Sequence, residues 1–483
     1  MSLNEITPVT AADRPPELPL VVDLDGAVLR SAAIQHTVFG AFRHGPAYLW
    51  RNPGFLLSGV EALKRVLIKQ AVLDSETWPV RADVIEYLES EAARHRRIIL
   101  VTQADRIVAD AMLARFPFID SVIVAGCASD QAGTKAELLA ERFPGGFIYA
   151  GDPARDGDVW AIADGKVMVS SAPASQAAAG EAITTFPVQP VAMRAIRKCL
   201  RLHQWAKNGL VFLPALLDGK AGDASAWLYA NLGFLALSFV ASATYVVNDL
   251  WDLSDDRRHW SKSKRPLASG EVQLAHAVGV AGVLLAIGFL LALAVNWQST
   301  LLLVAYAIGT LSYSLGLKRI PLLDVLVLAS LFTLRLGMGM TLTDAKSSYW
   351  LLVFSMFVFT SLSAAKRHTE VRRQIEKGKS TSRRGYIATD LPLLLGFGLA
   401  SMFAALLISV LYLIEDAFPS GFYSEPKYLW LIPVLLSLFL GRIWLLSQRG
   451  ELNDDPVEFA VTDRISLILG ALMSASLVVA LFA

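Results

Sequence analysis

The chain has 483 residues, of which 54% are hydrophobic and 18% charged, with a formal net charge of +1. Its mean hydropathy of +0.46 excludes an ordinary soluble protein of this length. Its two cysteines, Cys127 and Cys199, fit no metal-binding spacing and exclude a disulfide framework. Residues 1–190 carry 17 Lys and Arg against 23 Asp and Glu, and residues 191–483 carry 27 against 20. We therefore expect an acidic soluble half followed by a basic, membrane-embedded half.

The soluble half begins with a polar, Pro-rich stretch at 1–17, which we expect to be disordered. It lacks the apolar core of a signal peptide, so the soluble half is expected to stay in the cytoplasm. Apolar runs follow at 18–22, 98–101, 121–124 and 147–150, with helix-like segments between them. This alternation predicts a doubly wound α/β domain with a parallel sheet, whose site lies at the carboxyl ends of the strands.

Polar side chains stand at these strand ends and at one helix start. They are Asp23 and Asp25 in Asp-Leu-Asp-Gly, Thr102, Lys135 at the helix start, and Asp152 and Asp156 in Gly-Asp-Pro-Ala-Arg-Asp.

In this order the motifs resemble those of haloacid dehalogenase-like phosphatases, over about residues 18–170. The resemblance implies that Asp23 is the nucleophile and that Asp25 protonates the leaving oxygen and then activates water. Thr102 and Lys135 are then expected to hold phosphoryl oxygens. Asp23, the Asp25 carbonyl and Asp152 are expected to bind Mg²⁺, supported by Asp156. Ala27 departs from the family pattern, which usually has Thr.

An insertion at about 31–78 is rich in aromatic and aliphatic residues and matches the position of the small helical cap in this family. Most of these side chains are expected to form the core of the cap itself. A sharper hypothesis is that the cap leans on the bilayer to accept a lipid-linked substrate. Residues 171–192 are rich in small side chains and are expected to be a linker.

The second domain, 193–483, is expected to be an all-α transmembrane domain of nine helices, because each apolar segment is near the length that crosses a bilayer. The segments are 209–217, 226–247, 274–294, 299–316, 320–341, 349–365, 391–415, 427–447 and 464–483.

Lys and Arg are concentrated on the linker side of these segments, and the opposite loops hold only Lys220, Lys346 and Lys427. The positive-inside rule predicts a multi-pass membrane protein with the phosphatase-like domain and the cation-rich face in the cytoplasm. Arg335 lies mid-span and is expected to face a polar cavity; snorkelling to the interface is the alternative.

The stretch from Tyr245 to Gly270 begins where the second apolar segment ends and packs acids before cations. On a helix, Asp249, Asp252 and Asp256 fall within an arc of about 60°. Three carboxylates on one face repel each other unless a cation lies between them, and oxygen ligands suit Mg²⁺, which usually bridges to phosphates. We therefore predict a Mg²⁺ site for a phosphate ligand; a solvated acidic helix end is the alternative.

This acidic face, with Asn248, resembles the first motif of the UbiA superfamily of intramembrane prenyltransferases, over about 197–483. Residues 365–370, Ala-Lys-Arg-His-Thr-Glu, replace the second acidic motif of members that alkylate aromatic rings. That departure resembles the decaprenyl-phosphate phosphoribosyltransferase branch. Further matches are Gln204-Trp-Ala-Lys-Asn208, Tyr313-Ser-Leu-Gly-Leu-Lys-Arg319, Lys366-Arg-x-x-Glu370, Arg384-Gly-Tyr386 and Asp455-Pro with Asp463-Arg464.

The resemblance implies transfer of 5-phosphoribose from phosphoribosyl diphosphate (PRPP) to a polyprenyl (decaprenyl) phosphate. Mg²⁺ on the three aspartates is expected to neutralise the departing pyrophosphate. Lys207 or Arg335 is expected to hold the phosphate of the acceptor. The other expected substrate-binding residues are Asn248, Lys264, Arg265, Tyr313, Lys318, Arg319, Lys366, Arg367, Glu370 and Arg384.

Fusion of the two halves predicts a bifunctional enzyme with one Mg²⁺ at each site. The phosphatase is expected to remove the 5-phosphate of the transferase product, for synthesis of a cell-envelope arabinan or related glycan, and tethering raises its effective concentration. Two alternatives stay open: a prenyltransferase acting on an aromatic acceptor, and a non-catalytic N-terminal module. The expected partners are PRPP, polyprenyl phosphate and the bilayer, without nucleic acid; homo-oligomerisation stays open.

Overall fold

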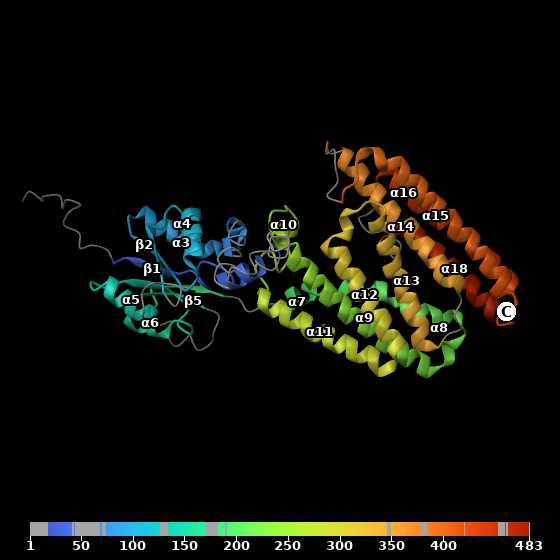
Figure 1. Cartoon of the computed structure of the whole chain (residues 1–483), viewed down its shortest axis with the longest axis horizontal. Coiled ribbons are helices and arrows are strands. Elements are labelled where there is room, and N and C mark those ends of the chain that lie inside the picture. Colours follow the sequence, from blue (N-terminus) through green and yellow to red (C-terminus); the bar gives the residue numbers. More distant parts are fainter. Residues whose placement is uncertain are drawn as a thin grey trace, which may run out of the picture. The chain divides into compact units, whose positions relative to one another are not determined.

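A six-stranded parallel sheet forms the centre of the N-terminal part of the chain, in the order β3-β2-β1-β4-β5-β6 (Figure 1). The predicted parallel α/β sheet is therefore confirmed. The strand order reverses between β1 and β4, the position at which doubly wound sheets bind ligands beyond their carboxyl ends. The strands are β1 Leu20–Asp23, β2 Ile98–Thr102, β3 Ser121–Val124, β4 Ile148–Gly151, β5 Gly165–Ser170 and β6 Thr184–Pro187.

Helices cover both faces of this sheet, because side chains along a strand alternate between faces. Leu20 and Val22 of β1 pack in one core cluster with Val84 and Met112, which belong to the helices α3 and α4. Val21 packs in the other cluster, with side chains of α5 and α6. The helices are α3 Ala82–Ala93, α4 Arg106–Arg115, α5 Lys135–Arg142 and α6 Gly157–Ile162, with a 3₁₀ turn η3 at Ser75–Thr77.

The sheet extends further than the sequence suggested, since β5 and β6 were not predicted and β6 lies inside the expected linker 171–192. The expected leader 1–17 and most of the expected cap 31–78 lie outside the described residues. The structure describes residues 18–40, 43, 68–69, 74–125, 134–170, 182–188, 191–344, 349–376, 378, 384–419, 421–452, 459 and 462–482.

The chain divides into two compact units, and the division does not follow the expected domain boundary. The first unit joins Met1–Cys199 to Asp249–Val278, and the second joins Leu200–Asn248 to Gly279–Ala483. The acidic stretch therefore belongs to the same unit as the parallel sheet. Its elements are the last residues of α9 (Ala224–Trp251), α10 (Leu253–Arg257), the 3₁₀ turn η8 (Lys262–Lys264) and the start of α11 (Leu274–Val295).

Seven helices in the described part of the chain are long and apolar enough to cross a membrane. They are Ala224–Trp251, Leu274–Val295, Leu323–Thr343, Tyr349–Glu376, Ala388–Ala417, Pro426–Arg449 and Arg464–Leu481.

The expected count of nine is therefore corrected. The expected span at 209–217 becomes a 3₁₀ helix, η6 (Leu202–Phe212), and the five-residue α8 (Leu213–Leu217), which are too short or too irregular to cross a bilayer. The span at 299–316 is the helix α12 (Trp297–Leu315), which has 19 residues but carries several polar side chains. It is not among the seven.

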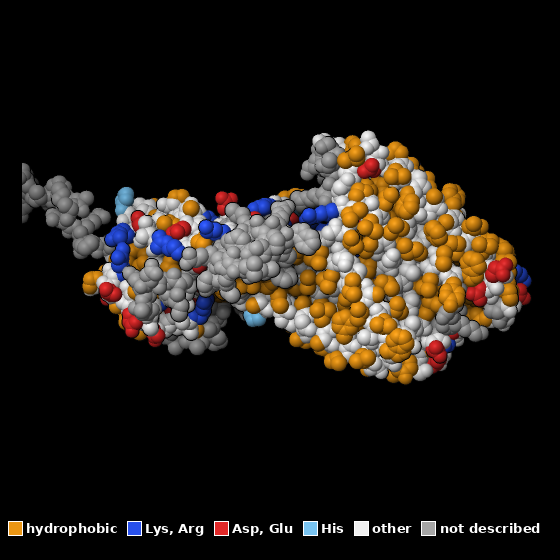
Figure 2. Space-filling model, in the orientation of Figure 1, with side chains coloured by type: hydrophobic (Ala, Val, Ile, Leu, Met, Phe, Trp, Pro, Cys, Tyr) orange, Lys and Arg blue, Asp and Glu red, His pale blue; other side chains and the backbone are white. Residues whose placement is uncertain are grey.

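The second unit exposes large apolar side chains over its helices, as Figure 2 shows. Leu290, Leu407 and Val434 are examples, and a surface of this kind suits contact with lipid rather than water.

The remaining elements are α7 Met193–Cys199 in the first unit, and η7 Lys220–Gly222, η9 Leu317–Arg319, α13 Leu323–Thr343, α14 Tyr349–Glu376, η10 Ala388–Asp390, α15 Leu391–Tyr412, η11 Leu413–Ala417, η12 Pro426–Trp430, α16 Leu431–Arg449 and α18 Arg464–Phe482 in the second.

Candidate functional site

The first candidate site lies at the carboxyl ends of β1 and β4. Asp23 ends β1, and its Oδ1 accepts a hydrogen bond from Lys135 Nζ at 2.7 Å. Lys135 Nζ also donates to Asp156 Oδ1 at 3.0 Å, so one ammonium joins two carboxylates. Thr134 caps α5 and thereby fixes the start of the helix that carries Lys135. Three of the expected site residues are therefore brought together.

Tyr149 completes this cluster and was not expected from the sequence. Its hydroxyl accepts a hydrogen bond from Lys135 Nζ at 2.9 Å and donates one to Asp156 Oδ2 at 2.8 Å. Burial and the carboxylates of Asp23 and Asp156 raise the pKa of Tyr149, so the phenol stays protonated and acts as a donor. Its place in β4, two residues before Gly151 at the strand end, is the one signal that points to it.

Burial raises the pKa of Asp23 to about 7, against the lowering effect of Lys135. The Asp156 carboxylate adds to the rise. The pKa of Asp23 therefore lies near neutrality, where a cationic ligand shifts the carboxyl to its charged form.

The other expected residues of this site have different partners. Asp25 Oδ1 accepts from the backbone N–H of Ala33 at 2.7 Å, and Asp152 Oδ1 accepts from that of Ala154 at 3.0 Å. Thr102 is fully buried, and its Oγ1 accepts from Ala104 N at 3.0 Å. These contacts hold the strand-end loops in shape and leave only Asp23 and Asp156 on the shared ammonium.

Arg155 is a second residue that the sequence did not single out. Its Nη1 donates to the carbonyl oxygen of Asp25 at 2.7 Å. Gly26 follows the second aspartate and has φ +99°, a left-handed conformation that favours glycine.

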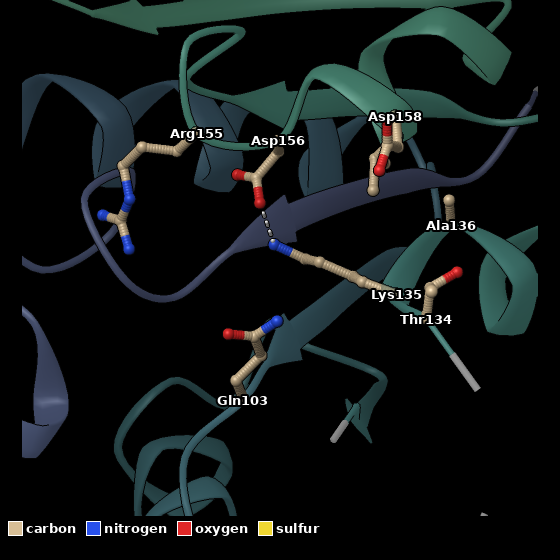
Figure 3. A pocket seen from close by; sticks show the side chains of 8 residues that line it. Gln103, Thr134, Lys135, Ala136, Arg155, Asp156 and Asp158 are labelled. Atoms are coloured by element: carbon tan, nitrogen blue, oxygen red, sulfur yellow. Dashed lines mark hydrogen bonds and ion pairs between the residues drawn. The ribbon is translucent and has the colours of Figure 1, made fainter. Parts of the chain in front are cut away.

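A cavity of about 280 Å³ opens beside this cluster. Lys135 and Asp156, which are hydrogen-bonded to each other, line it together with Arg155 and Gln103 (Figure 3). Its lining offers two cations and two amide or hydroxyl groups beside the carboxylates of Asp156 and Asp158. A small phosphorylated ligand matches this mixture, because cations bind phosphate oxygens while the carboxylates need a counter-cation.

The second candidate site is the acidic stretch. Arg265 Nη1 lies 3.2 Å from Asp249 Oδ1 and 2.5 Å from Asp256 Oδ2. Both carboxylates are buried, and Lys262 Nζ lies 3.8 Å from Asp256. Burial raises the pKa of Asp256, and Arg265 opposes the rise. Asp252 precedes α10 and is half-buried, whereas Lys264 lies in η8.

The carboxylate oxygens of both acidic clusters are suitable ligands for Mg²⁺, although a basic side chain lies between the carboxylates in each cluster. Within the residues that the structure describes, no three His, Cys, Asp or Glu side chains gather closely enough to hold a metal ion. Asp23 and Asp156 point at Lys135, and Asp249 and Asp256 point at Arg265. In each pair the oxygens converge on one point, and all-oxygen ligation is what Mg²⁺ prefers.

Arg335 lies in the middle of α13 and is 5% exposed. Its guanidinium donates to Asn208 Oδ1 at 2.8 Å, to the Leu331 carbonyl at 2.7 Å and to Tyr306 Oη at 2.9 Å. Arg335 is therefore buried among neutral acceptors instead of snorkelling to the interface, and no carboxylate stands among these described contacts. A buried cation in this setting attracts an anionic ligand.

Arg367 was expected to contact phosphate, but its side chain is 1% exposed and already bonded. Nε lies 2.5 Å from Asp324 Oδ2, and Nη1 lies 2.5 Å from Glu370 Oε2. Nη2 donates to Tyr313 Oη at 2.9 Å, which also accepts from Arg384 Nη1 at 2.6 Å. The network fixes the ends of α12, α13 and α14 relative to one another, so we correct Arg367 to a positioning residue.

The remaining expected cations of the second unit are more accessible. Lys318 and Arg319 form the turn η9 after α12, and Lys366 is half-buried in α14. Lys207 and Asn248 lie in η6 and α9. Lys207 is close enough to Tyr306 to act on it electrostatically. The side chains of Lys207, Lys318, Arg319 and Lys366 are therefore less buried than that of Arg367.

The model of the UbiA prenyltransferase family matches residues 211–468, more than half of the chain. The chain belongs to the UbiA prenyltransferase family. We refer to residues 211–468 as the UbiA domain. With its seven apolar helices, this is a multi-pass membrane protein.

Similar proteins include the Sinorhizobium fredii protein y4nM, 38% identical over 471 residues, which covers 96% of this chain and 91% of that protein. The nodulation protein NoeC of Azorhizobium caulinodans is 30% identical over 276 residues, or 56% of this chain and 87% of its own. The decaprenyl-phosphate phosphoribosyltransferase of Mycobacterium tuberculosis is 28% identical over 297 residues, or 60% and 94%. A solved UbiA homologue from Archaeoglobus fulgidus bound to GPP and Mg²⁺ is 18% identical, with a TM-score of 0.44 over 58% of this chain and 99% of that one.

Within the UbiA domain, Asp324 and Tyr306 were not expected from the sequence, and Tyr386 was noted there only as part of a motif, without a role. Asp324 is fully buried, Tyr386 Oη donates to its Oδ1 at 2.5 Å, and Leu322 N donates to the same hydroxyl at 2.8 Å. Tyr306 holds Arg335. An acid at the start of an apolar segment, as at Asp324, is a signal that was available.

Proposed function

We propose that this protein is a bifunctional membrane enzyme. Its UbiA domain transfers 5-phosphoribose from PRPP to a polyprenyl (decaprenyl) phosphate and releases pyrophosphate. The N-terminal unit is a haloacid dehalogenase-like phosphatase that removes the 5-phosphate, giving polyprenylphosphoryl-ribose for cell-envelope arabinan synthesis. Relatives named decaprenyl-phosphate phosphoribosyltransferase support the transferase half.

One observation carries the choice of reaction. Members that alkylate aromatic rings use a second acidic motif at the end of the sixth span, whereas residues 365–370 of this chain carry Lys366 and Arg367. The two acids that contact this segment in the described structure, Asp324 and Glu370, are both paired with Arg367. We therefore assign metal and diphosphate to the Asp249 segment, and this supports a donor whose other phosphate is held by cations.

The acceptor is proposed to be anionic because of Arg335. The phosphate of a polyprenyl lipid supplies the charge that the neutral partners Asn208 and Tyr306 do not. Lys207 is the second candidate for this phosphate. A polyprenyl phosphate is already a nucleophile, so the transfer requires no strong general base.

In the transfer, an oxygen of the lipid phosphate forms a bond to C1 of the ribose while the bond from C1 to the diphosphate oxygen breaks. Mg²⁺, when bound to Asp249, Asp252 and Asp256, neutralises charge on the phosphate oxygens. Lys264 and Arg265 stabilise the leaving pyrophosphate. We assign the remaining phosphate contacts to Lys318, Arg319 and Lys366, with Asn248, Tyr313, Glu370 and Arg384 as supporting residues.

In the phosphatase, Asp23 attacks the phosphorus of the 5-phosphate, and the ribose oxygen leaves with a proton from Asp25. Asp25 then takes a proton from water, whose oxygen attacks the phosphoaspartate and releases inorganic phosphate. Lys135 and Thr102 are assigned to the phosphoryl oxygens, and Asp152 and Asp156 to the metal. The shared ammonium between Asp23 and Asp156 supports this assignment, since it already screens two carboxylates.

We place both activities on the cytoplasmic face of a bacterial cytoplasmic membrane, because Lys and Arg are concentrated in alternate loops between the apolar segments, those that the positive-inside rule puts in the cytoplasm. PRPP is a soluble, highly charged substrate, and this face gives it access. The lipid product then stays within reach of the phosphatase.

Purified protein tests the proposal directly. Given PRPP and polyprenyl phosphate, it should release pyrophosphate, whereas prenyl diphosphate with an aromatic acid should release none. The opposite pattern would establish aromatic alkylation instead.

Lipid mass spectrometry on the Asp23→Asn variant tests the phosphatase half, and it should show the 5-phosphorylated lipid accumulating with pyrophosphate release unchanged. Continued removal of the 5-phosphate by this variant would show that Asp23 is not the nucleophile or that the module is not catalytic.

A further inference from the structure

The acidic stretch that carries Asp249 and Asp256 is held by the N-terminal part of the same unit. We propose that the N-terminal half is an integral part of the transferase, in which Arg257 and Arg258 are positioning residues that hold the metal-binding stretch in shape. The inference rests on the proposed metal role of this stretch and goes beyond a phosphatase that is merely tethered.

The first contact is an ion pair between α10 and the segment before α3. Arg258 Nη2 lies 2.5 Å from Asp74 Oδ1. Asp74 itself is fixed, because its carbonyl oxygen accepts hydrogen bonds from the backbone N–H and the hydroxyl of Thr77. The Asp74 side chain is 20% exposed, so the pair has one sheltered partner. This ion pair therefore fixes the position of the carboxyl end of α10, in addition to balancing charge.

The second contact joins Arg257 to the imidazole of His36, which is buried and neutral. Arg257 Nη2 lies 3.2 Å from His36 Nδ1, and His36 Nε2 lies 2.8 Å from Ser31 Oγ. His36 also stacks on Trp78 with ring centroids 4.8 Å apart. Because a guanidinium has no acceptor, Nδ1 accepts and Nε2–H donates, so the imidazole is neutral. Burial and Arg257 keep the pKa of His36 well below its usual value, which maintains this contact at neutral pH.

Further contacts secure the two ends of the stretch. At the start of α10, Arg43 Nη2 lies 3.0 Å from Asp255 Oδ2, and Arg43 Nη1 donates to Ser254 Oγ. At the far end, Gly270 has φ +72°, and a Cβ there would meet Pro79 Cγ at 2.8 Å and Arg30 Cβ at 3.1 Å. The backbone at Gly270 therefore approaches the N-terminal part so closely that only glycine fits.

These contacts matter because α10 has only five residues, Leu253–Arg257. A helix shorter than about 12 residues is marginal without tertiary packing. Asp256 points to Arg265 and Asp249, while its neighbours Asp255 and Arg257 contact Arg43 and His36. Asp256 therefore lies between two residues that anchor α10, Asp255 and Arg257. If these anchoring contacts are lost, Asp256 is displaced from Arg265 and Asp249.

The relatives indicate that this coupling is not general to such transferases. The Mycobacterium tuberculosis transferase aligns with 60% of this chain but 94% of its own length, so it has no counterpart for the rest of this chain. In this chain the proposed metal-binding stretch instead depends on Asp74 and His36.

A charge swap tests the positioning role in the full-length protein. Asp74→Arg and Arg258→Asp should each raise the Mg²⁺ concentration for half-maximal pyrophosphate release by about 10-fold, since each displaces Asp256. The double variant Asp74→Arg/Arg258→Asp should recover most of the loss. Asp110→Arg, which breaks the exposed Arg106–Asp110 pair of α4, is the matched control and should change nothing. An unchanged Mg²⁺ requirement in the single variants, or no recovery in the swap, would overturn the proposal.

Crosslinking tests the docking without relying on the reaction. In full-length protein with its two native cysteines replaced by serine, Asp74→Cys/Arg258→Cys should be joined by a short bis-maleimide and detected by mass spectrometry. Glu141→Cys/Arg258→Cys is the control, because α5 covers the face of the sheet opposite to α3 and α4. Equal crosslinking of both pairs would overturn the docking. If the Asp74→Cys/Arg258→Cys variant is crosslinked but the wild type releases no pyrophosphate, the proposed transfer fails and the docking of the stretch stands.

Discussion

Arg367 and Asp324 form an ion pair in the interior of the UbiA domain, with Nε 2.5 Å from Oδ2 and side chains 1% and 0% exposed. Removing one partner leaves an uncompensated buried charge, which typically costs about 3–5 kcal/mol. We predict that Asp324→Leu lowers the free energy of unfolding by about that amount, as measured by thermal or denaturant unfolding in detergent.

The double variant Asp324→Leu/Arg367→Met separates the cost of a lone charge from the value of the pair. It should be much more stable than Asp324→Leu, because no charge is left buried. Arg372→Met, which removes a partly exposed i,i+4 partner of Glu376 on the same helix, is the control and should have little effect. If the double variant is as unstable as the single one, the pair is not the cause.

Lys135 joins Asp23 to Asp156, and replacing it leaves two carboxylates and a tyrosine hydroxyl without their common cation. We predict that Lys135→Met lowers phosphate release by about 100-fold or more. Arg142→Met removes an exposed cation from the other end of the same helix and serves as the control. The measurement is release of inorganic phosphate from the 5-phosphorylated lipid. Equal rates for both variants would exclude Lys135 from the phosphatase site.

The α/β architecture could be predicted from the sequence because its signals are local. A run such as Leu20–Asp23 is buried on both faces, and such strands are continuous apolar segments between turn signals. The strand β6 was not predicted, because its residues alternate between half-buried and exposed and it follows a stretch of small residues. The number of spans was overestimated at 209–217, where apolar composition does not reveal a 3₁₀ backbone.

The candidate sites were predictable where charge stands out against an apolar background, as at Asp23, Asp249 and Arg335. Partners supplied by distant segments were not. Tyr306 looks like any aromatic residue of a membrane helix, and nothing near Asp74 in the sequence points to Arg258, 184 residues away. Arg367 shows the converse error, since a cation in a basic loop was expected to meet a ligand and instead meets Asp324.

Arg335 offers a test of the proposed anionic acceptor. We predict that Arg335→Leu lowers pyrophosphate release by about 100-fold, because a charge-assisted contact is lost in a dry setting. Arg335→Lys should recover only part of it, since a point charge cannot reach Asn208, Leu331 and Tyr306 together. Lys427→Leu, at an exposed cation, is the control.

The same variant distinguishes the two sources of phosphate. If Arg335 holds the lipid, Arg335→Leu should lose the preference for polyprenyl phosphate over neutral polyprenol in direct binding, with PRPP binding unchanged. Loss of PRPP binding with the lipid preference retained would assign Arg335 to the donor instead.

The raised pKa of Asp23 predicts how Mg²⁺ stabilisation depends on pH. The unfolded carboxyl ionises near its ordinary value of 3.8, whereas the folded one keeps its proton to about 7. The stability that the protonated Asp23 carboxyl contributes is therefore fully present below pH 3.8 and is lost as pH rises through about 7.

Mg²⁺ binds ionised carboxylates, so we expect it to raise the melting temperature by about 5 °C more at pH 8 than at pH 5. Asp23→Asn should remove most of this difference and leave the part that comes from Asp256, whose pKa is raised in the same direction. Differential scanning fluorimetry with and without Mg²⁺ measures it, and an equal gain at both pH values in the wild type would contradict a metal role for Asp23.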